Sequence, residues 1–323
     1  MTVEVEASRP ALHPNTELVR GILPILVCSV FWGAVGLVSV YAPAAASPES
    51  VGAAGMVVTG TLMLAARPGA RVLIRRARGR DRLLLVIGSI GQLAYPLAFF
   101  PAVRDLGVAL ATAITLGSAP LFAGLMARFV ERRRLTRRWL RCAPIAVAGT
   151  VLMVAGDASA HAVSMIGVLL ALIPGLAYAT VSTVAARLIG QGKASGDVYG
   201  TMFGASAVWS VPVLLLCGTH GLVSVRGIAV VLFFGCVTNY LCYTMFGSAL
   251  RYTSAATATT VTLAEGAVGT LLGVFAHGEH LAAPAWAGLG LLAVALVLLS
   301  LPRRAAGARA AGLPDERRTA PLD

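Results

Sequence analysis

Charged residues are scarce in this sequence. They make up 12% of the 323 residues, against roughly 25% in an average soluble domain. Hydrophobic residues make up 57%, and the mean hydropathy is +0.81. This composition excludes a soluble globular protein. The chain also lacks the GxxxxGK[ST] motif whose backbone cradles nucleotide phosphates, so nothing supports ATP-driven transport within it.

Cysteine motifs are missing as well. The five cysteines show neither CxxC nor CxxxH spacing, so the sequence indicates neither a metal site nor a disulfide framework. The nearest approach to a metal cluster is the segment HGEH, where His277 and His280 flank Glu279 without a third strong ligand. A structural or catalytic zinc site needs at least three protein ligands. We therefore expect no metal and no other cofactor.

Ten apolar windows account for most of the chain. Each is close to the roughly 20 residues that a helix needs to cross a bilayer, and no stretch long enough for a soluble domain is left over. We therefore predict an all-α integral membrane protein with ten transmembrane helices. The windows cover residues 20–42, 50–66, 83–103, 106–127, 139–156, 164–186, 199–217, 228–250, 254–276 and 284–301.

The net charge of +12 reflects membrane topology. If the N-terminus is cytoplasmic, 24 of the 26 basic residues lie in cytoplasmic segments, and only Arg104 and Arg226 lie outside. Because positive residues concentrate on the inner side of a membrane, both termini are predicted to be cytoplasmic in a multi-pass plasma-membrane protein. The arginine-rich, lysine-poor composition favours a bacterial inner membrane. We expect no nucleic-acid partner, whereas the arginine-rich stretches 67–82 and 128–141 should attract anionic lipid headgroups.

The chain repeats itself at an offset of 147 residues. AVRDLGVALATAITL (102–116) aligns with ALRYTSAATATTVTL (249–263) at seven identical positions of fifteen, and the same offset pairs Gln92 with Asn239. Each unit holds five predicted spans, an odd number, so the second unit must cross the membrane in the opposite sense. Such inverted repeats are typical of secondary transporters, in which solute binds near the midplane between the halves. The predicted organisation is a cytoplasmic tail, a first repeat, an external linker, a second repeat and a disordered cytoplasmic tail, at residues 1–19, 20–156, 157–163, 164–301 and 302–323.

These features resemble the EamA family of the drug/metabolite transporter superfamily. The resemblance covers nearly the whole chain between residues 20 and 301, and it implies two five-helix repeats and an exporter of metabolites or drugs. It rests on FWG (31–33), the repeated segments, SAPLFAGL (118–125), AYA (177–179), LAEGAVGTLLGVFAHGEHL (263–281) and WAGLGLLAVALVL (286–298).

The chain also departs from the family pattern. The family usually has Glu-Pro where this sequence has Glu265-Gly266, and an arginine common in the second span is absent from GAAGMVVTGTL (52–62). The resemblance therefore does not carry over any gating pair built on that arginine.

Glu265 is the candidate for a proton-coupling group. It lies near the middle of the window 254–276, where a charged side chain costs roughly 2.5 to 3.5 kcal/mol. Its helix face carries small or polar residues, namely Ser254, Ala258, Thr262, Gly269 and Gly273. Because such faces pack against other helices or line wet gaps, Glu265 is predicted to point inward. There it either binds a proton or cation in each transport cycle or, alternatively, serves as a neutral hydrogen bonder between helices.

Six further residues are candidates for solute binding. Gln92 and Asn239 lie near the centres of the third and eighth spans, and each shares a helix face with a tyrosine, Tyr95 at i+3 and Tyr243 at i+4. Such neighbours present an amide beside an aromatic ring. Trp32 and Tyr178 are expected to add aromatic wall. The alternatives are interhelical amide hydrogen bonds and aromatic side chains that only pack or anchor the interface.

The sequence therefore predicts a secondary transporter, not an enzyme. Its solutes are expected to be small polar or amphipathic metabolites or drugs, moved by alternating access and driven by protons or by the solute gradient itself. The alternatives are a membrane-embedded enzyme or lipid-handling protein, and a sensor that has lost transport. An enzyme would need a paired base and nucleophile or a metal cage within the spans. The sequence leaves the identity of the solute and the oligomeric state open.

Overall fold

The computed structural model describes residues 18–129, 137–158, 164–249, 252, 261–262, 264–278 and 281–300. Within these ranges the chain is helical, with short turns and no strand. The predicted tails and the linker lie largely outside them. The elements in chain order are η1 (Leu18–Ile22), α2 (Leu23–Val40), α3 (Pro48–Ala66), α4 (Pro68–Arg76), α5 (Gly79–Leu106), α6 (Val108–Phe129), α7 (Arg137–Ala158), α8 (Met165–Gly190), α9 (Ser195–Cys217), α10 (Val225–Leu232), η2 (Phe233–Leu241), α11 (Cys242–Ala249), α13 (Ala264–His277) and α14 (Ala283–Ser300).

Seven helical segments of the described chain are long and apolar enough to cross a membrane. Two shorter apolar helical stretches, Leu140–Met153 and Ala283–Ala295, add to them. Large apolar side chains on these segments are exposed, including Leu215 at 79% and Ile166 at 69%. Exposed apolar surface of this extent is expected where helices face lipid. The protein is therefore an all-helical, multi-pass membrane protein, while the number of ten spans stays a prediction.

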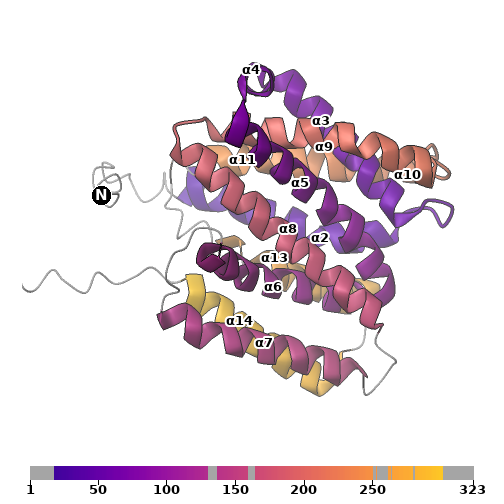
Figure 1. Cartoon of the computed structure of the whole chain (residues 1–323). Coiled ribbons are helices and arrows are strands. Elements are labelled where there is room, and N and C mark those ends of the chain that lie inside the picture. Colours follow the sequence, from indigo (N-terminus) through magenta and orange to yellow (C-terminus); the bar gives the residue numbers. More distant parts are fainter. Residues whose placement is uncertain are drawn as a thin grey trace, which may run out of the picture.

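The helix contacts follow a two-fold pattern (Figure 1). α3 packs against α9, and α7 packs against α14, so equivalent helices of the two halves pair with each other. The contact of α2 with α13 corresponds to that of α8 with α6, and the contact of α5 with α8 corresponds to that of α2 with η2 and α11. Exchange of the halves therefore maps these contacts onto themselves or onto one another, as expected for two structural repeats.

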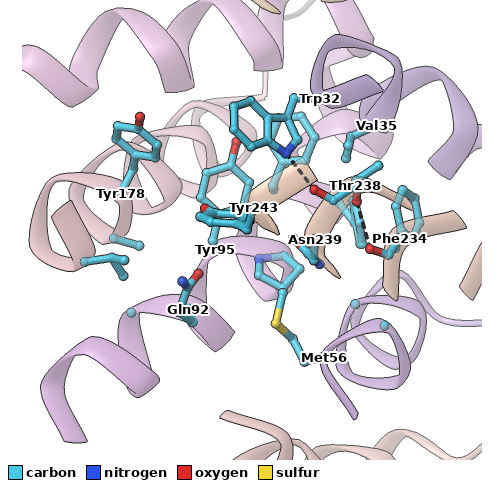
Figure 2. Close-up of a pocket in the computed structure, with 18 of the residues that line it drawn as sticks. Trp32, Val35, Met56, Gln92, Tyr95, Tyr178, Phe234, Thr238, Asn239 and Tyr243 are labelled. Atoms are coloured by element: carbon cyan, nitrogen blue, oxygen red, sulfur yellow. Dashed lines mark hydrogen bonds between the residues drawn. The ribbon is translucent and has the colours of Figure 1, made fainter. Parts of the chain in front are cut away.

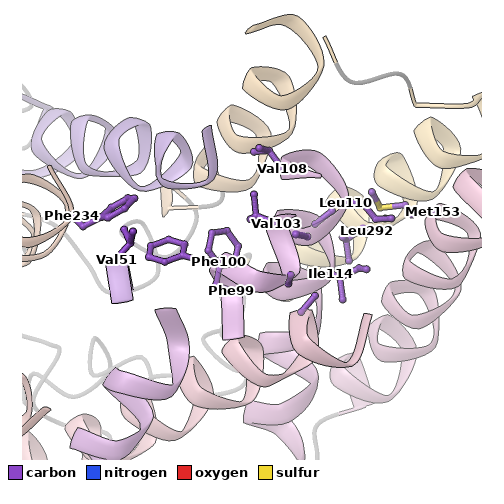
Figure 3. Packing of buried hydrophobic residues seen from close by; sticks show 14 of the residues in the cluster. Val51, Phe99, Phe100, Val103, Val108, Leu110, Ile114, Met153, Phe234 and Leu292 are labelled. Carbon is purple, nitrogen blue, oxygen red and sulfur yellow. The ribbon is translucent and has the colours of Figure 1, made fainter. Parts of the chain in front are cut away.

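Three phenylalanines lie within the mainly aliphatic core where the halves meet (Figure 3). Phe99 and Phe100 of α5 pack with Phe234 of η2, and the rings of Phe100 and Phe234 lie 4.7 Å apart between centroids. Val51 of α3 joins them, and Val108 continues the cluster into α6. Aromatic pairs at this distance stabilise packing beyond the area that they bury. This core forms one side of the cavity described below.

Two elements differ from the expected pattern of plain spans. The segment 67–82, expected to be a cytoplasmic loop, contains the short helix α4, with Pro68 at its first position and Arg75 and Arg76 in its last turn. Proline at the first position and basic residues in the last turn both favour a helix. The span near residues 228–250 is interrupted by the π-helix η2. Such wide turns leave some backbone groups outside the regular hydrogen-bond ladder.

Candidate functional site

A cavity of about 130 Å³ lies at the meeting point of the two halves (Figure 2). By this measure a cavity holds one water molecule per roughly 10 to 15 Å³, so there is room for several waters or for part of a small solute. The lining comes from α2, α3, α5 and α6 of the first half and from α8, α9, η2, α11 and α13 of the second. Segments far apart in the sequence therefore build one chamber, which we call the central pocket.

All seven candidate residues lie on the central pocket. The first half contributes Trp32 from α2 together with Gln92 and Tyr95 from α5. The second half contributes Tyr178 from α8, Asn239 from η2, Tyr243 from α11 and Glu265 from α13. The amide pair that the repeat matches, Gln92 and Asn239, thus lies on one chamber (Figure 2).

Glu265 reaches the central pocket because α13 packs closely on α2. A Cβ atom added to Gly33 of α2 would lie 2.7 Å from the backbone oxygen of Glu265 and 2.7 Å from Cβ of Val268, so only glycine permits this approach. On α13 itself, Gly269 and Gly273 are buried, whereas Leu271 is 45% exposed. Ser254 and Ala258 lie outside the described residues.

No lysine, arginine or histidine lines the central pocket in the part of the chain that the structure describes. Glu265 is the single acidic residue of that lining. A carboxylate removed from water is strongly destabilised unless a proton or a cation offsets its charge. The chamber is therefore suited to a proton or to a positively charged group of a solute.

Two buried polar groups on the central pocket have no hydrogen-bond partner among the described residues. They are the amide nitrogen Nε2 of Gln92 and the hydroxyl Oγ1 of Thr112. An unmatched buried donor costs roughly 1 to 3 kcal/mol. Such groups are retained where a bound molecule can supply the missing partner. A solute with a carbonyl, carboxylate or hydroxyl oxygen would do so here.

Aromatic rings pack together beside the central pocket. Tyr243 lies 5.5 Å from Trp32, 5.2 Å from Tyr199 and 5.0 Å from Phe203, measured between ring centroids. The Trp32 indole Nε1 donates a hydrogen bond of 2.7 Å to the backbone oxygen of Thr238, within the π-helix η2 (Figure 2). This hydrogen bond anchors the indole to the π-helix, and so holds Trp32 at the pocket wall.

The sequence did not point to several lining residues. Thr112 of α6 and Tyr199 of α9 line the central pocket, yet both belong to small-residue or aromatic patterns that are common in membrane helices. One feature of the sequence could have indicated Thr112, because it is among the positions that are identical between the two repeats. Glu279 and His280 of the HGEH segment lie outside the described residues.

Replacement of Gln92 by leucine should separate stability from binding. Because the leucine removes an unmatched donor, we expect the solute-free protein to melt a few degrees higher, in line with roughly 1 to 3 kcal/mol. Solute affinity should fall by about 2- to 10-fold, the equivalent of one hydrogen bond. Thermal unfolding and solute titration on the purified protein measure both. The control Gln191→Leu, on an exposed residue, should not change affinity. A lower melting temperature with unchanged affinity would contradict the assignment.

An all-helical membrane protein whose two halves enclose a polar and aromatic chamber has the architecture of a membrane transporter. The chain belongs to the EamA-like transporter family, whose model matches it twice, over residues 19–155 and 165–301.

One relative supports this assignment, and one solved structure supports the fold. A protein of Bacillus subtilis (strain 168) named "Uncharacterized transporter YwfM" is 30% identical over 288 residues, which cover 89% of this chain and 96% of that relative. A protein of known crystal structure has the same fold, with a TM-score of 0.60 at 18% identity over 86% of this chain and 95% of the other.

Proposed function

We propose that this transporter moves small polar or amphipathic solutes by alternating access through the central pocket. The observation that carries the proposal is the convergence of Gln92, Tyr95 and Trp32 from the first repeat with Tyr178, Asn239, Tyr243 and Glu265 from the second on one chamber. In this proposal the amides and the unmatched donors bind polar groups of the solute, and the aromatic wall receives its apolar part. A solute held by both repeats is exposed to one side or the other as the repeats move.

Glu265 is proposed as the coupling group. Support comes from its place as the single acid of the described lining and from the instability of an uncompensated charge in an apolar site. Protonation and solute binding then compete for one carboxylate, so that uptake of a proton from one side favours release of the solute. Because the proton and the solute exclude each other at this carboxylate, the flux of one is coupled to the flux of the other.

Export is the proposed direction, with both termini in the cytoplasm. The family resemblance supports export, and the distribution of arginine supports the orientation. In the second repeat the predicted spans cross the membrane in the opposite sense to those of the first.

A resistance screen tests the proposed function. Cells that express the chain are challenged with toxic amino-acid analogues, nucleosides and cationic dyes, beside cells that express the variant Asn239→Leu at the same level. We expect resistance to at least one class of compound and its loss in the variant, because the leucine removes a polar contact of the central pocket. Purified protein in liposomes then gives the flux of that compound directly. If no compound shifted the resistance or crossed the liposome membrane, a sensor or scaffold would be the better interpretation.

A further inference from the structure

A second cavity of about 430 Å³ lies at the other end of α5, where the chain leaves α4. We call it the arginine pocket. It shares no lining residue with the central pocket. Its lining includes Ile74 and Arg75 of α4, Arg78 of the connection, Arg82 and Leu85 of α5, and Thr201 of α9.

The arginine pocket concentrates positive charge without a counter-charge. Arg75, Arg78 and Arg82 form no hydrogen bond and no ion pair within the part of the chain described. The nearest acid in sequence, Asp81, is already paired with Lys193, at 2.9 Å between Oδ2 and Nζ. All three arginines are exposed, so their guanidinium groups are open to the surroundings, and three positive groups around one cavity favour an anion between them. Guanidinium groups bind phosphate oxygens through two parallel hydrogen bonds, which makes phosphate the fitting anion.

Apolar side chains surround the same pocket. Ile74 and Leu85 lie in its lining. On the same two helices, Val72 of α4 is 46% exposed and Leu83 of α5 is 58% exposed. Arginines and exposed apolar residues on one short helix are typical of elements that lie at the lipid headgroup level. An occupant with an apolar part beside its phosphate therefore fits these surroundings better than a soluble phosphate compound.

The walls of the arginine pocket are firmly joined. Thr201 Oγ1 of α9 donates a hydrogen bond of 3.1 Å to the backbone oxygen of Ala70 in α4, and it also lines the pocket. Two residues before it, Tyr199 lines the central pocket. A ligand of the arginine pocket thus touches α5 of the first repeat and α9 of the second, close to where α9 contributes to the central pocket.

We propose that the arginine pocket is a binding site for the phosphate group of an anionic phospholipid. Arg75, Arg78 and Arg82 hold the phosphate, and the acyl chains lie along the apolar face beside α4 and α5. Binding at this site differs from a general attraction of the basic segment to a charged membrane. Of the seven arginines between residues 67 and 82, only three line the cavity.

Two triple variants with equal loss of charge test the proposal. They are Arg75→Gln, Arg78→Gln and Arg82→Gln in the pocket, and Arg71→Gln, Arg76→Gln and Arg80→Gln on the same segment outside the lining. Each purified protein is titrated in detergent with phosphatidylglycerol, with phosphatidylcholine and with inorganic phosphate, and the shift in melting temperature is recorded. The pair of single variants Arg82→Gln and Arg80→Gln serves the same comparison if a triple variant does not fold.

For the unsubstituted protein and the outside variant, we expect phosphatidylglycerol to raise the melting temperature at similar concentrations. The pocket variant should need roughly tenfold more of it or more, because each lost arginine weakens the hold on an anionic headgroup. Phosphatidylcholine and inorganic phosphate should have little effect. Equal responses of the two triple variants would overturn the proposal, because they would show attraction by net charge alone. A full shift with inorganic phosphate would overturn it too, because the site would then bind soluble phosphate compounds.

Discussion

Replacement of Glu265 by glutamine is expected to abolish flux driven by a pH gradient while the protein still folds. Glutamine has nearly the same shape and hydrogen-bonding reach as glutamic acid, but it cannot release a proton. If a positively charged part of the solute binds the carboxylate, its loss removes a charged contact of about 1.5 to 3 kcal/mol, equivalent to roughly 10- to 100-fold weaker binding. The measurement is solute flux in liposomes with and without a pH gradient, for the unsubstituted protein and the variant.

A matched control exists on α3. Glu49 lies in the first turn of that helix and outside the central pocket, so Glu49→Gln removes the same charge without touching the chamber. It should leave gradient-driven flux unchanged. If Glu265→Gln transported as well as the unsubstituted protein under a pH gradient, Glu265 would have no part in coupling, and solute-driven exchange would be the remaining mechanism.

Replacement of Gly288 by leucine is expected to destabilise the protein strongly. Gly288 of α14 faces Gly149 of α7, and a Cβ atom at Gly288 would lie 2.5 Å from the backbone oxygen of Gly149 and 2.7 Å from the backbone nitrogen of Met153. Backbone atoms cannot rotate away, so the two helices must separate. Overpacking of this kind costs roughly 1 to 3 kcal/mol and more when backbone has to move. Thermal unfolding and the yield of monodisperse protein measure the loss.

The same helix supplies the control. Gly290 has no atom within 4 Å of an added Cβ atom, so Gly290→Leu should fold like the unsubstituted protein. Gly149→Leu should repeat the defect of Gly288→Leu, because an added Cβ atom there lies 2.7 Å from the backbone oxygen of Gly288. Equal stability of the Gly288 and Gly290 variants would contradict the close pairing of α7 with α14, the last described helices of the two halves.

The sequence predicted the helical membrane fold and the family because their signals are large. A polar or acidic side chain inside an apolar span is costly, so Gln92, Asn239 and Glu265 stand out against their surroundings. All three line the central pocket. Their roles in binding and coupling stay predictions, and the experiments above test them.

Other features lacked such a signal. The π-helix η2 arises from a shift in backbone hydrogen bonding. Neither the spacing nor the composition of its segment FFGCVTNYL predicts that shift. Helix α4 was not predicted because hydropathy windows detect long apolar transmembrane helices, whereas α4 is a nine-residue amphipathic helix rich in arginine. Tyr199 belongs to α9, and its place on the central pocket follows from how α9 packs against α3 and α5, which the sequence alone does not give.

Chemical labelling of Glu265 tests directly whether its carboxyl group projects into a solute-binding chamber. Dicyclohexylcarbodiimide is an apolar reagent that modifies protonated carboxyl groups within membrane proteins, and peptide mass spectrometry identifies the labelled residue. We predict that Glu265 is labelled and that a transported solute slows its labelling in proportion to occupancy of the central pocket. Labelling at the same rate under saturating solute, or no labelling of Glu265 at all, would contradict a solute-binding chamber into which this carboxyl group projects.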